Sequence, residues 1–376
     1  MDDIKVCGVI RDSGACGLYR ITQPLKFLAE EEGMDVAIGG VEFKSVEFKT
    51  DLFNLLQECD IAIIPRVVSE KTLQLIKVLK DMSPRKKVII DYDDNIFEVT
   101  PFSTHYRDFG TREVSHNNIK IWQDGKDLFD IQRNIDNLNL AKEALRIVDG
   151  VFVTTPILAD VYSKYNKNIY TLPNSLDFNI WKPSNLVKDD KVRITWHGGS
   201  SHYEDLHEIG GELTNITNKH KNVKIVTCGH EFKGVFKNIP SDQYEHHGWV
   251  DVLAHPYKQI LLNADLAVIP LKDHKFNYSK SPIKWIEYSS LGIPCVLKDI
   301  HPYSNLVIHG ITGFLYKTTE ECEFWMDKLV EHPSLRKRIG DAAKEYVHEH
   351  FDAKKNSKYW SEAIKTIMEE KCLSPQ

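Results

Sequence analysis

The sequence lacks any apolar run long enough to cross a membrane as a helix, which takes about 20 residues. Its first residues, MDDIKV, also lack the basic region and apolar core of a secretory signal peptide. From these two absences we expect a cytoplasmic protein without a transmembrane segment, either free or bound at a membrane surface.

Positive charge and cysteine are also scarce. The chain has 48 Lys and Arg residues against 54 Asp and Glu residues, a formal net charge of −6, so no overall basic surface marks a nucleic-acid-binding protein. A local basic patch is compatible with the same count. The seven cysteines are odd in number and show no paired spacing, which counts against a disulfide framework and favours a reducing compartment.

What the sequence does contain is a regular alternation of apolar strands with amphipathic helices. This alternation is typical of a parallel, doubly wound sheet, and 376 residues are more than one core usually serves. We therefore predict an α/β protein with two such domains, residues 1–182 and 191–350, joined by the polar segment 182–191. Residues 351–376 carry a last amphipathic helix. The glycine fingerprint G-x-G-x-x-G is missing after the first strand, which counts against a nicotinamide-dependent oxidoreductase.

The segment 276–296, FNYSKSPIKWIEYSSLGIPCV, predicts a helix at the edge of the second sheet. Ser281 is a good N-cap, Pro282 is a good first helical residue, and Gly292 ends the helix. An apolar strand, 264–271, precedes the segment. The helix N-terminus should therefore lie at the carboxyl edge of the sheet, where ligands bind in folds of this kind.

Three charged side chains cluster at the start of this predicted helix. Lys280 stands just before it, and Lys284 and Glu287 share one helical face. A helix N-terminus offers free N–H groups and partial positive charge. The cluster therefore predicts a phosphate site, with a carboxylate one turn deeper for a pair of hydroxyls. The alternative is a simple i,i+3 ion pair on a solvated helix face.

A glycine-containing loop follows the first strand of each predicted domain. Glycines let backbone N–H groups approach an anion, so both loops, RDSGACGLYR and HGGSSHYEDL, are candidates for contact with a diphosphate. The residues of interest are Gly17 and Arg20 in the first loop, and Gly199, Ser200 and His202 in the second. The alternative for the first loop is a plain strand–helix turn with a surface arginine.

The pattern K-x-x-E-Y-x-x-x-G-x-P at 284–294 resembles the donor-binding segment of the family-4 glycosyltransferases. The runs DGVFVTTP, LPNSLD and GITGFLY are similar to that family as well, and the resemblance covers nearly the whole chain. It implies the GT-B fold, in which two Rossmann-like domains face each other across a cleft and a final helix crosses back onto the N-terminal domain. It also implies a retaining enzyme that moves a hexose or pentose from a UDP- or GDP-sugar to a hydroxyl of a glycan or a lipid-linked glycan.

The resemblance assigns roles to single residues. It implies that Glu287 holds the donor ribose and that Lys280 stabilises the departing diphosphate, without an enzyme nucleophile. The donor contacts that it implies are Gly17, Arg20, Gly199, Ser200, His202, Gly229, Trp249, Val250, Asn277, Ser279, Lys280, Lys284 and Glu287. Two positions depart from the family, because Ser279 replaces the first of two glutamates and His202 replaces a basic side chain. The donor sugar is left open, and a non-catalytic nucleotide-sugar- or glycan-binding protein is an alternative.

An acidic cluster, DYDDN, ends the strand predicted at 87–91. Three carboxylates this close, Asp91, Asp93 and Asp94, would suit a divalent metal. The resemblance implies instead that lysine, arginine and helix N-termini hold the diphosphate, so we predict neither a metal nor another cofactor. Asp93 and Asp94 join Lys280 as candidate catalytic residues, through contacts with hydroxyls of the sugar or the acceptor. The alternative is a turn followed by an N-cap.

The segment 96–129 has no clear periodicity and is rich in aromatic residues. Because so long an insertion is unusual for structure alone, we predict an acceptor-binding lid, with a packing flap as the alternative. The acceptor would stack on Tyr106, Phe109 and Trp122. The segment also resembles virus-encoded members of the family, some of which glycosylate modified DNA bases. A flipped base would stack in the same way, and the DNA phosphates would meet Arg107, Arg112, Lys120 and Lys126. The oligomeric state is left open.

Overall fold

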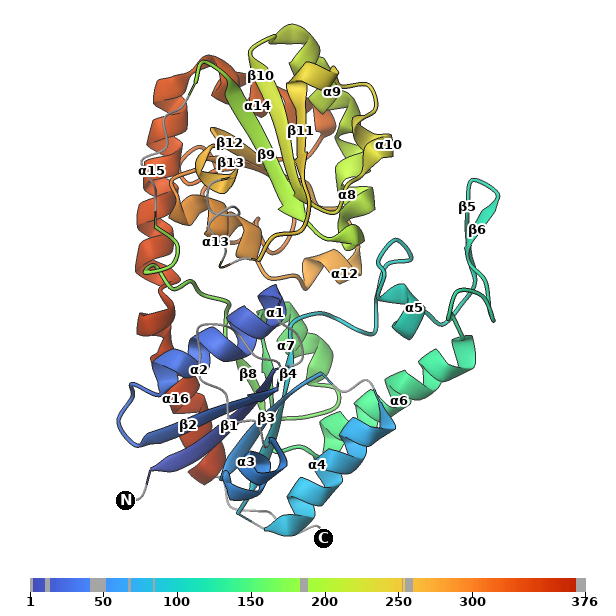
Figure 1. The fold of residues 1–376 in the computed structure, drawn as a ribbon, viewed down its shortest axis with the longest axis vertical. Helices are drawn as coiled ribbons and strands as arrows, with labels where there is room; N and C mark the ends of the chain where they lie inside the picture. Colours follow the sequence, from blue (N-terminus) through green and yellow to red (C-terminus); the bar gives the residue numbers. More distant parts are fainter. Residues whose placement is uncertain are drawn as a thin grey trace.

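The structure is a computed structural model that describes residues 3–10, 14–40, 52–66, 69–83, 85–182, 189–251, 253 and 260–369. These residues form two lobes stacked along the long axis of the molecule (Figure 1). Each lobe contains one six-stranded parallel sheet with helices packed on it, which is the α/β architecture that the alternating pattern predicts. None of the described helices is long and apolar enough to cross a membrane.

The first lobe is built on a sheet with the strand order β2-β1-β3-β4-β7-β8. Its strands are β1 (Ile4–Ile10), β2 (Met34–Gly40), β3 (Ile61–Pro65), β4 (Lys87–Tyr92), β7 (Gly150–Val153) and β8 (Ile169–Thr171). The inner strands β3 and β7 are apolar and buried, as a parallel sheet between two helical layers requires. The chain direction across the sheet reverses between β1 and β3. A reversal of this kind leaves a crevice at the carboxyl ends of the strands, where ligands bind.

Helices cover this sheet, and several begin at the predicted signals. They are α1 (Ala15–Gly17), the π-helical turn η1 (Leu18–Thr22), α2 (Gln23–Leu28), α3 (Leu52–Glu58), α4 (Glu70–Met82), α6 (Ile131–Ile147) and α7 (Pro156–Tyr162). The side chains of Ser69, Asp130 and Thr155 cap α4, α6 and α7 by accepting from a backbone N–H three residues on. The glycine loop after β1 differs from its prediction, because helical structure already begins at Ala15. Gly17 is thus a buried helical residue and does not belong to an open loop.

The second lobe repeats this plan with the strand order β11-β10-β9-β12-β13-β14, which reverses between β9 and β12. Its strands are β9 (Val192–Gly198), β10 (Val223–Gly229), β11 (Tyr244–His247), β12 (Leu266–Ile269), β13 (Cys295–Lys298) and β14 (Phe314–Tyr316). Its helical segments are η2 (Ser200–His202), α8 (Tyr203–Glu208), α9 (Gly210–Lys219), α10 (Lys233–Phe236), η3 (Ser241–Gln243), α12 (Lys275–Tyr278), α13 (Ile283–Ser290), α14 (Thr319–Glu331) and α15 (Pro333–His350).

The last helix returns to the first lobe. α15 packs on α13 in the second lobe, and α16 (Ala353–Glu369) packs on α2 in the first, so the two helices follow one side of the molecule (Figure 1). The apolar face of α16, including Trp360 and Ile364, is buried. A hydrogen bond of 2.6 Å from Ser357 Oγ to Oε1 of Glu31 fixes the contact. The chain thus makes the crossing that the GT-B resemblance implies.

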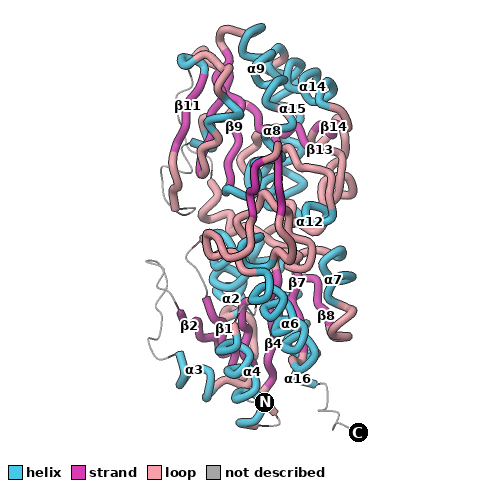
Figure 2. Tube along the Cα trace, turned by 90° about the vertical axis from the view of Figure 1, so that its right-hand side faces the viewer, coloured by secondary structure: helices cyan, strands magenta, loops and turns pink. Residues whose placement is uncertain are grey.

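Residues 96–129 contain more regular structure than their pattern predicts. They form α5 (Tyr106–Phe109) and an antiparallel hairpin of β5 (Val114–His116) and β6 (Ile119–Trp122). The turn places Asn117 and Asn118 at φ 48° and 63°, the left-handed conformation that a two-residue hairpin needs and that asparagine tolerates. The hairpin stands away from the rest of the first lobe in Figure 1, and Figure 2 shows it from the front, level with the lower part of the second lobe.

Candidate active site

The two lobes meet through residues that follow the carboxyl ends of their strands. Thr155, just after β7, donates from Oγ1 to the carbonyl oxygen of Ser279 at 3.0 Å. Asn174, after β8, donates from Nδ2 to Oγ of Ser281 at 3.0 Å. The crevices of the two sheets therefore open toward one shared interface.

The start of α13 lies at this interface, one residue later than predicted. The helix begins at Ile283, and Pro282 occupies the N-cap position without a side-chain cap. Ser281 is not the N-cap, because its hydroxyl is engaged by Asn174 of the first lobe. The first N–H groups of α13 therefore lack a capping side chain, which leaves them for another acceptor.

Lys284 begins a chain of polar side chains at the start of α13. Its Nζ lies 2.9 Å from Nε2 of His202, and Nδ1 of His202 lies 2.6 Å from Oδ2 of Asp205. Asp205 is itself fixed, because its Oδ1 accepts from the backbone N–H of Lys272 at 2.6 Å and from Nδ2 of Asn277 at 3.0 Å. The carboxylate favours the His202 tautomer with a proton on Nδ1, which leaves Nε2 to accept from Lys284.

Burial is the first cause that acts on the pKa values of His202, Lys284 and Asp205. It lowers the pKa of His202 to about 3, with the charges of Lys284 and Lys280 acting in the same direction, so His202 is neutral at pH 7. Burial also lowers the pKa of Lys284 to about 8, and the charge of Lys280 is the second cause. Burial alone would raise the pKa of Asp205, but the hydrogen bond from His202 and other contacts outweigh it, and that pKa is lowered. Lys284 is thus a cation at neutral pH in surroundings that disfavour its charge.

Lys280 adds a second positive charge near the first. It is half-buried, and its ammonium lies 4.8 Å from the centroid of the Phe276 ring. Within the described residues, its side chain makes no hydrogen bond or ion pair. The partner of Lys284, His202, carries no charge. Two ammonium groups are therefore held near a helix N-terminus without a carboxylate bonded to either, which favours an anion there.

Glu287 is one turn deeper in α13 and is already bonded through both oxygens. Its Oε1 accepts from the hydroxyl of Tyr19 at 2.6 Å, and its Oε2 lies 2.7 Å from Nε2 of His197. The other ring nitrogen of His197 lies 2.6 Å from the hydroxyl of Tyr288. Glu287 is only 4% exposed. A diol that binds through Oε1 of this carboxylate would therefore compete with Tyr19, which comes from the first lobe.

The first lobe brings a second group of charges to the interface. Arg66, just after β3, faces Asp93 and Asp94, and a cavity of about 40 Å³ lies among Arg66, Asp93 and Cys16. Burial would raise the pKa of Asp93, but Arg66 and the Cys16 thiol outweigh it, and the pKa is lowered. Burial, followed by the charge of Arg66, lowers the pKa of His105, and Lys280 of the second lobe acts in the same direction. The two groups of charges therefore lie within electrostatic reach of each other.

Comparison with known proteins identifies the fold of the two lobes. Residues 177–346 match the model of the family described as glycosyl transferases group 1. Solved structures match the chain over nearly its whole length and include GT-B glycosyltransferases. The chain has the GT-B fold. The second lobe therefore resembles a glycosyltransferase family in sequence, and the whole chain resembles GT-B structures in fold.

Three of the matching structures show how far the likeness extends. HepE from Anabaena, solved with UDP and glucose, has a TM-score of 0.67 and 13% identity, with 96% of this chain and 100% of HepE covered. Sucrose-phosphate synthase from Thermosynechococcus elongatus has a TM-score of 0.66 and 13% identity over 97% and 99% of the two chains. A putative UDP-N-acetylglucosamine 2-epimerase from Listeria monocytogenes reaches 0.52 at 11% identity, over 97% and 96%. At such low identity these structures show the fold alone. A search of curated protein sequences found no match.

Within the GT-B fold, some predicted donor residues lie at the interface. Gly199 is the N-cap of η2 and packs beside the ring of Trp249. Trp249 is 73% exposed, and Val250 next to it is half-buried. Ser200 lies near Thr104 of the first lobe, with 3.5 Å between their hydroxyl oxygens. Glycine is required at Gly229, because its φ is 103° and a Cβ there would lie 2.3 Å from the carbonyl oxygen of Gly198.

Three residues that were predicted to bind the sugar donor already bond to other groups of the protein. Arg20 is 2% exposed and forms a 2.6 Å ion pair with Asp91, so it is not a surface arginine and its guanidinium braces the first lobe. The side chain of Asn277 is buried and donates to Asp205, so it orients the series of hydrogen bonds from Asp205 through His202 to Lys284. Ser279 is fully buried, and its hydroxyl donates to the carbonyl oxygen of Phe276 at 2.8 Å. Ser279 therefore offers the donor sugar no replacement for the missing glutamate.

The predicted acceptor platform is a packed core. Tyr106 and Phe109 are 4% and 5% exposed, so the structure contradicts their assignment as stacking faces. Tyr106, Trp122 and Phe129 pack together with ring centroids 5.4 to 5.8 Å apart. Trp122 also donates from its indole nitrogen to the carbonyl oxygen of Pro101 at 2.5 Å. The aromatic side chains gather there because the insertion has its own small apolar centre to bury.

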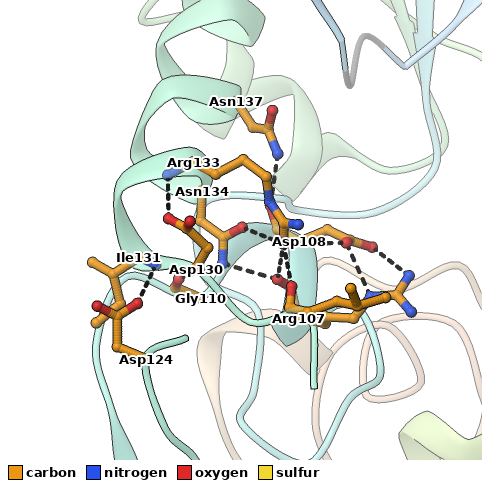
Figure 3. Close-up of polar contacts among 10 residues, drawn as sticks. Arg107, Asp108, Gly110, Asp124, Asp130, Ile131, Arg133, Asn134 and Asn137 are labelled. Atoms are coloured by element: carbon orange, nitrogen blue, oxygen red, sulfur yellow. Dashed lines mark hydrogen bonds and ion pairs between the residues drawn. The ribbon is translucent and has the colours of Figure 1, made fainter. Parts of the chain in front are cut away.

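Polar contacts fasten the same insertion to α6 (Figure 3). Asn134 donates from Nδ2 to the carbonyl oxygens of Arg107 and Gly110 at 2.9 and 2.8 Å, and Nη2 of Arg133 donates to the Arg107 carbonyl at 3.1 Å. The guanidinium of Arg107 pairs with Asp108 at 3.1 Å. This part of the insertion has the character of a packing flap.

Several polar residues of the interface are not among the site residues that the sequence predicts. The most important are Tyr19, Arg66, His105, His197 and Asp205. A signal existed for Arg66 and His197, because each lies at the carboxyl end of a predicted strand, where ligands bind in such sheets. Tyr19 gave no signal, since its partner Glu287 is 268 positions away in the sequence.

Proposed function

We propose that the protein is a retaining glycosyltransferase of the family-4 type, which moves a sugar from a UDP- or GDP-sugar to a hydroxyl of a saccharide. In this proposal residues 191–350 bind the donor, residues 1–182 bind the acceptor, and the helix within 351–376 joins the two lobes. The observation that carries it is the pair of ammonium groups, Lys280 and Lys284, near the N-terminus of α13 in a GT-B interface. Neither ammonium is bonded to a carboxylate within the described residues.

The protein's own groups can perform the electrostatic part of the transfer. As the bond between the sugar and the diphosphate breaks, negative charge grows on the leaving diphosphate. Lys280, Lys284 and the first N–H groups of α13 would stabilise that charge. His202 and Asp205 hold the Lys284 ammonium in place, so little reorganisation is needed when the anion arrives.

The first lobe would supply polar contacts to the sugar and the acceptor. Asp93, Asp94 and His105 lie on that side, where His105 is within electrostatic reach of Lys280 and Asp94 is within reach of Lys284. We assign Asp93 and Asp94 to hydroxyl groups of the transferred sugar or the acceptor. Because the two lysines offset the diphosphate charge, the proposed reaction requires no divalent metal.

A saccharide acceptor is better supported than DNA. The segment 96–129 holds five carboxylates and four Lys or Arg side chains, so it offers no surplus of positive charge to a polyanion. Two of those four basic groups are paired, Arg107 with Asp108 and Lys120 with Glu113. The alternative of a non-catalytic nucleotide-sugar-binding protein is favoured by one feature, the buried Ser279 where the family has a glutamate.

A panel of nucleotide sugars tests the proposal. The purified protein is incubated with each UDP- and GDP-sugar and a mixture of saccharides, and the released nucleotide is measured. We expect turnover with at least one donor, a product with the donor's anomeric configuration by NMR, and a loss of turnover of at least a hundredfold in Lys280→Met. Lys317→Met, which removes a lysine whose side chain is 77% exposed, is the matched control. Tight nucleotide binding without any turnover would favour the non-catalytic alternative.

A further inference from the structure

A groove separate from the site of Lys280 and Lys284 (the lysine site) lies between the insertion of the first lobe, residues 96–129, and α8 of the second lobe. Its volume is about 200 Å³. The insertion contributes two residues to its walls and the second lobe contributes five, four of them from α8: Phe102 and His116, then Tyr203, Glu204, His207, Glu208 and Lys272. It is therefore a groove that exists only where the two lobes meet.

Aromatic rings line a continuous part of this groove. Phe102 meets His116 edge to face, with ring centroids 5.1 Å apart, and stacks on Tyr203 at 6.0 Å. On the far side of Tyr203, the ring of His207 follows at 5.6 Å. Phe102 and Tyr203 are half-buried, and His116 and His207 are exposed, so the rings remain open to a bound molecule. The apolar faces of a sugar ring pack well on surfaces of this kind.

Two carboxylates in the groove are held in fixed positions. Oε2 of Glu204 accepts from Oγ1 of Thr100 at 2.7 Å across the two lobes. Oε1 of Glu208 accepts from Nζ of Lys298 at 2.7 Å. Each carboxylate keeps lone pairs beyond these contacts, because a carboxylate can accept about four hydrogen bonds. The ammonium of Lys272, which also lines the groove, lies 3.4 Å from Oε2 of Glu208 and is therefore paired. Fixed acceptors beside aromatic faces suit a neutral molecule with many hydroxyl groups.

The groove is next to the proposed donor site along the chain. His202, which contacts Lys284, directly precedes Tyr203, which lines the groove. One short segment therefore carries a residue of the lysine site and a wall of the groove. A chain of sugars that enters through the groove would reach the donor from the side of the insertion.

We propose that this groove is the acceptor subsite for a neutral saccharide, with Phe102 and Tyr203 as its stacking faces and Glu204 and Glu208 as its hydrogen-bond acceptors. Acceptor binding is then shared between the two lobes, because α8 of the second lobe completes the side that residues 1–182 provide. The inference rests on the proposed function for the statement that the bound saccharide is an acceptor. The stacking faces predicted in the same insertion were Tyr106, Phe109 and Trp122, of which the first two are buried and the third is half-buried. The open ring of the insertion is Phe102, which occupies the side that faces α8.

The test measures saccharide binding and transfer separately. The probe is a set of neutral tetrasaccharides of glucose, galactose, mannose and N-acetylglucosamine. Saturation-transfer NMR follows binding to the full chain without donor, and transfer assays use the donor that the nucleotide-sugar panel identifies. We expect one or more tetrasaccharides to bind, and Phe102→Ala and Glu204→Gln each to weaken binding and raise the acceptor KM at least tenfold. UDP affinity and slow donor hydrolysis should stay unchanged.

A matched control separates the groove from the rest of the insertion. Ile119, at the hairpin tip, is 68% exposed and does not line the groove, so Ile119→Ala should change neither binding nor KM. Glu204→Gln keeps an oxygen for Thr100, which makes it informative even if Phe102→Ala unfolds. Unchanged acceptor binding and KM in the groove variants, with donor turnover intact, would overturn the groove and leave the proposed function standing. Absence of tetrasaccharide binding to the wild type, or transfer to single-stranded DNA that depends on Phe102, would overturn the inference as well.

Discussion

Replacing Lys284 by methionine should stabilise the empty protein and weaken its affinity for nucleotide. The pKa of this lysine falls from 10.5 to about 8 in the folded protein. At about 1.4 kcal/mol for each pKa unit, the charged form carries a penalty of at most about 3 kcal/mol at pH 7. Partial exposure and the lost hydrogen bond to His202, worth about 1 kcal/mol, reduce the gain. We therefore expect Lys284→Met to raise the free energy of unfolding by about 1 to 2 kcal/mol.

The same substitution should reduce the affinity for UDP or GDP. A charge-assisted hydrogen bond to a phosphate contributes about 1.5 to 3 kcal/mol, which corresponds to a roughly 10- to 150-fold change in Kd. Isothermal calorimetry gives this Kd, and chemical denaturation of the same samples gives the stability. Lys337→Met is the control, because Lys337 is 77% exposed and its i,i+4 pair with Asp341 lies on the surface.

The dependence on pH gives this prediction a second test. The pKa of Lys284 in the folded protein, about 8, is below the value of 10.5 for the free side chain. The penalty is therefore complete below pH 8 and decreases as the pH rises from 8 toward 10.5, because the folded protein releases the proton first. The advantage of Lys284→Met should shrink over that range, and the nucleotide affinity of the wild type should fall. A destabilised Lys284→Met that binds UDP as the wild type does would refute this reasoning.

Three further predictions concern other parts of the interface. Tyr19→Phe should raise UDP affinity several-fold in calorimetry, because it frees one oxygen of Glu287 for the ribose. The same variant should lower the free energy of unfolding by about 1 to 3 kcal/mol, because a buried hydrogen bond is lost. Equal or weaker UDP binding would place the ribose elsewhere. Trp122→Ala should lower the free energy of unfolding by about 2 to 4 kcal/mol and leave the Kd for UDP unchanged, because the indole packs inside the insertion. A stable variant with poor acceptor use would instead support an acceptor-binding lid. A chelator should leave the rate of transfer unchanged, and recovery of lost activity with Mn²⁺ would identify Asp93 and Asp94 as metal ligands.

Much of the fold is readable from local pattern. The strand predicted at 87–91 is β4, and the helix predicted around Lys284 is α13, because apolar runs, Pro282 and Gly292 act within a few residues of chain. The β5–β6 hairpin was missed although its Asn117–Asn118 turn is a local signal as well. Its strands are only three and four residues long, too short for an alternating pattern to stand out.

The sequence by itself determined that Lys284 and Glu287 share one face of a helix and that Lys280 stands just before it, since helical spacing and the start signals fix that relation. Only the tertiary structure decided what these side chains do in the empty protein. Glu287 meets Tyr19 and His197, which lie 268 and 90 positions away, and Lys284 meets His202, 82 positions away. It also decided that Tyr106 faces a core and Phe102 faces a groove, although both are aromatic residues of one insertion. Such choices depend on which surfaces from distant segments come together, and no local pattern records that.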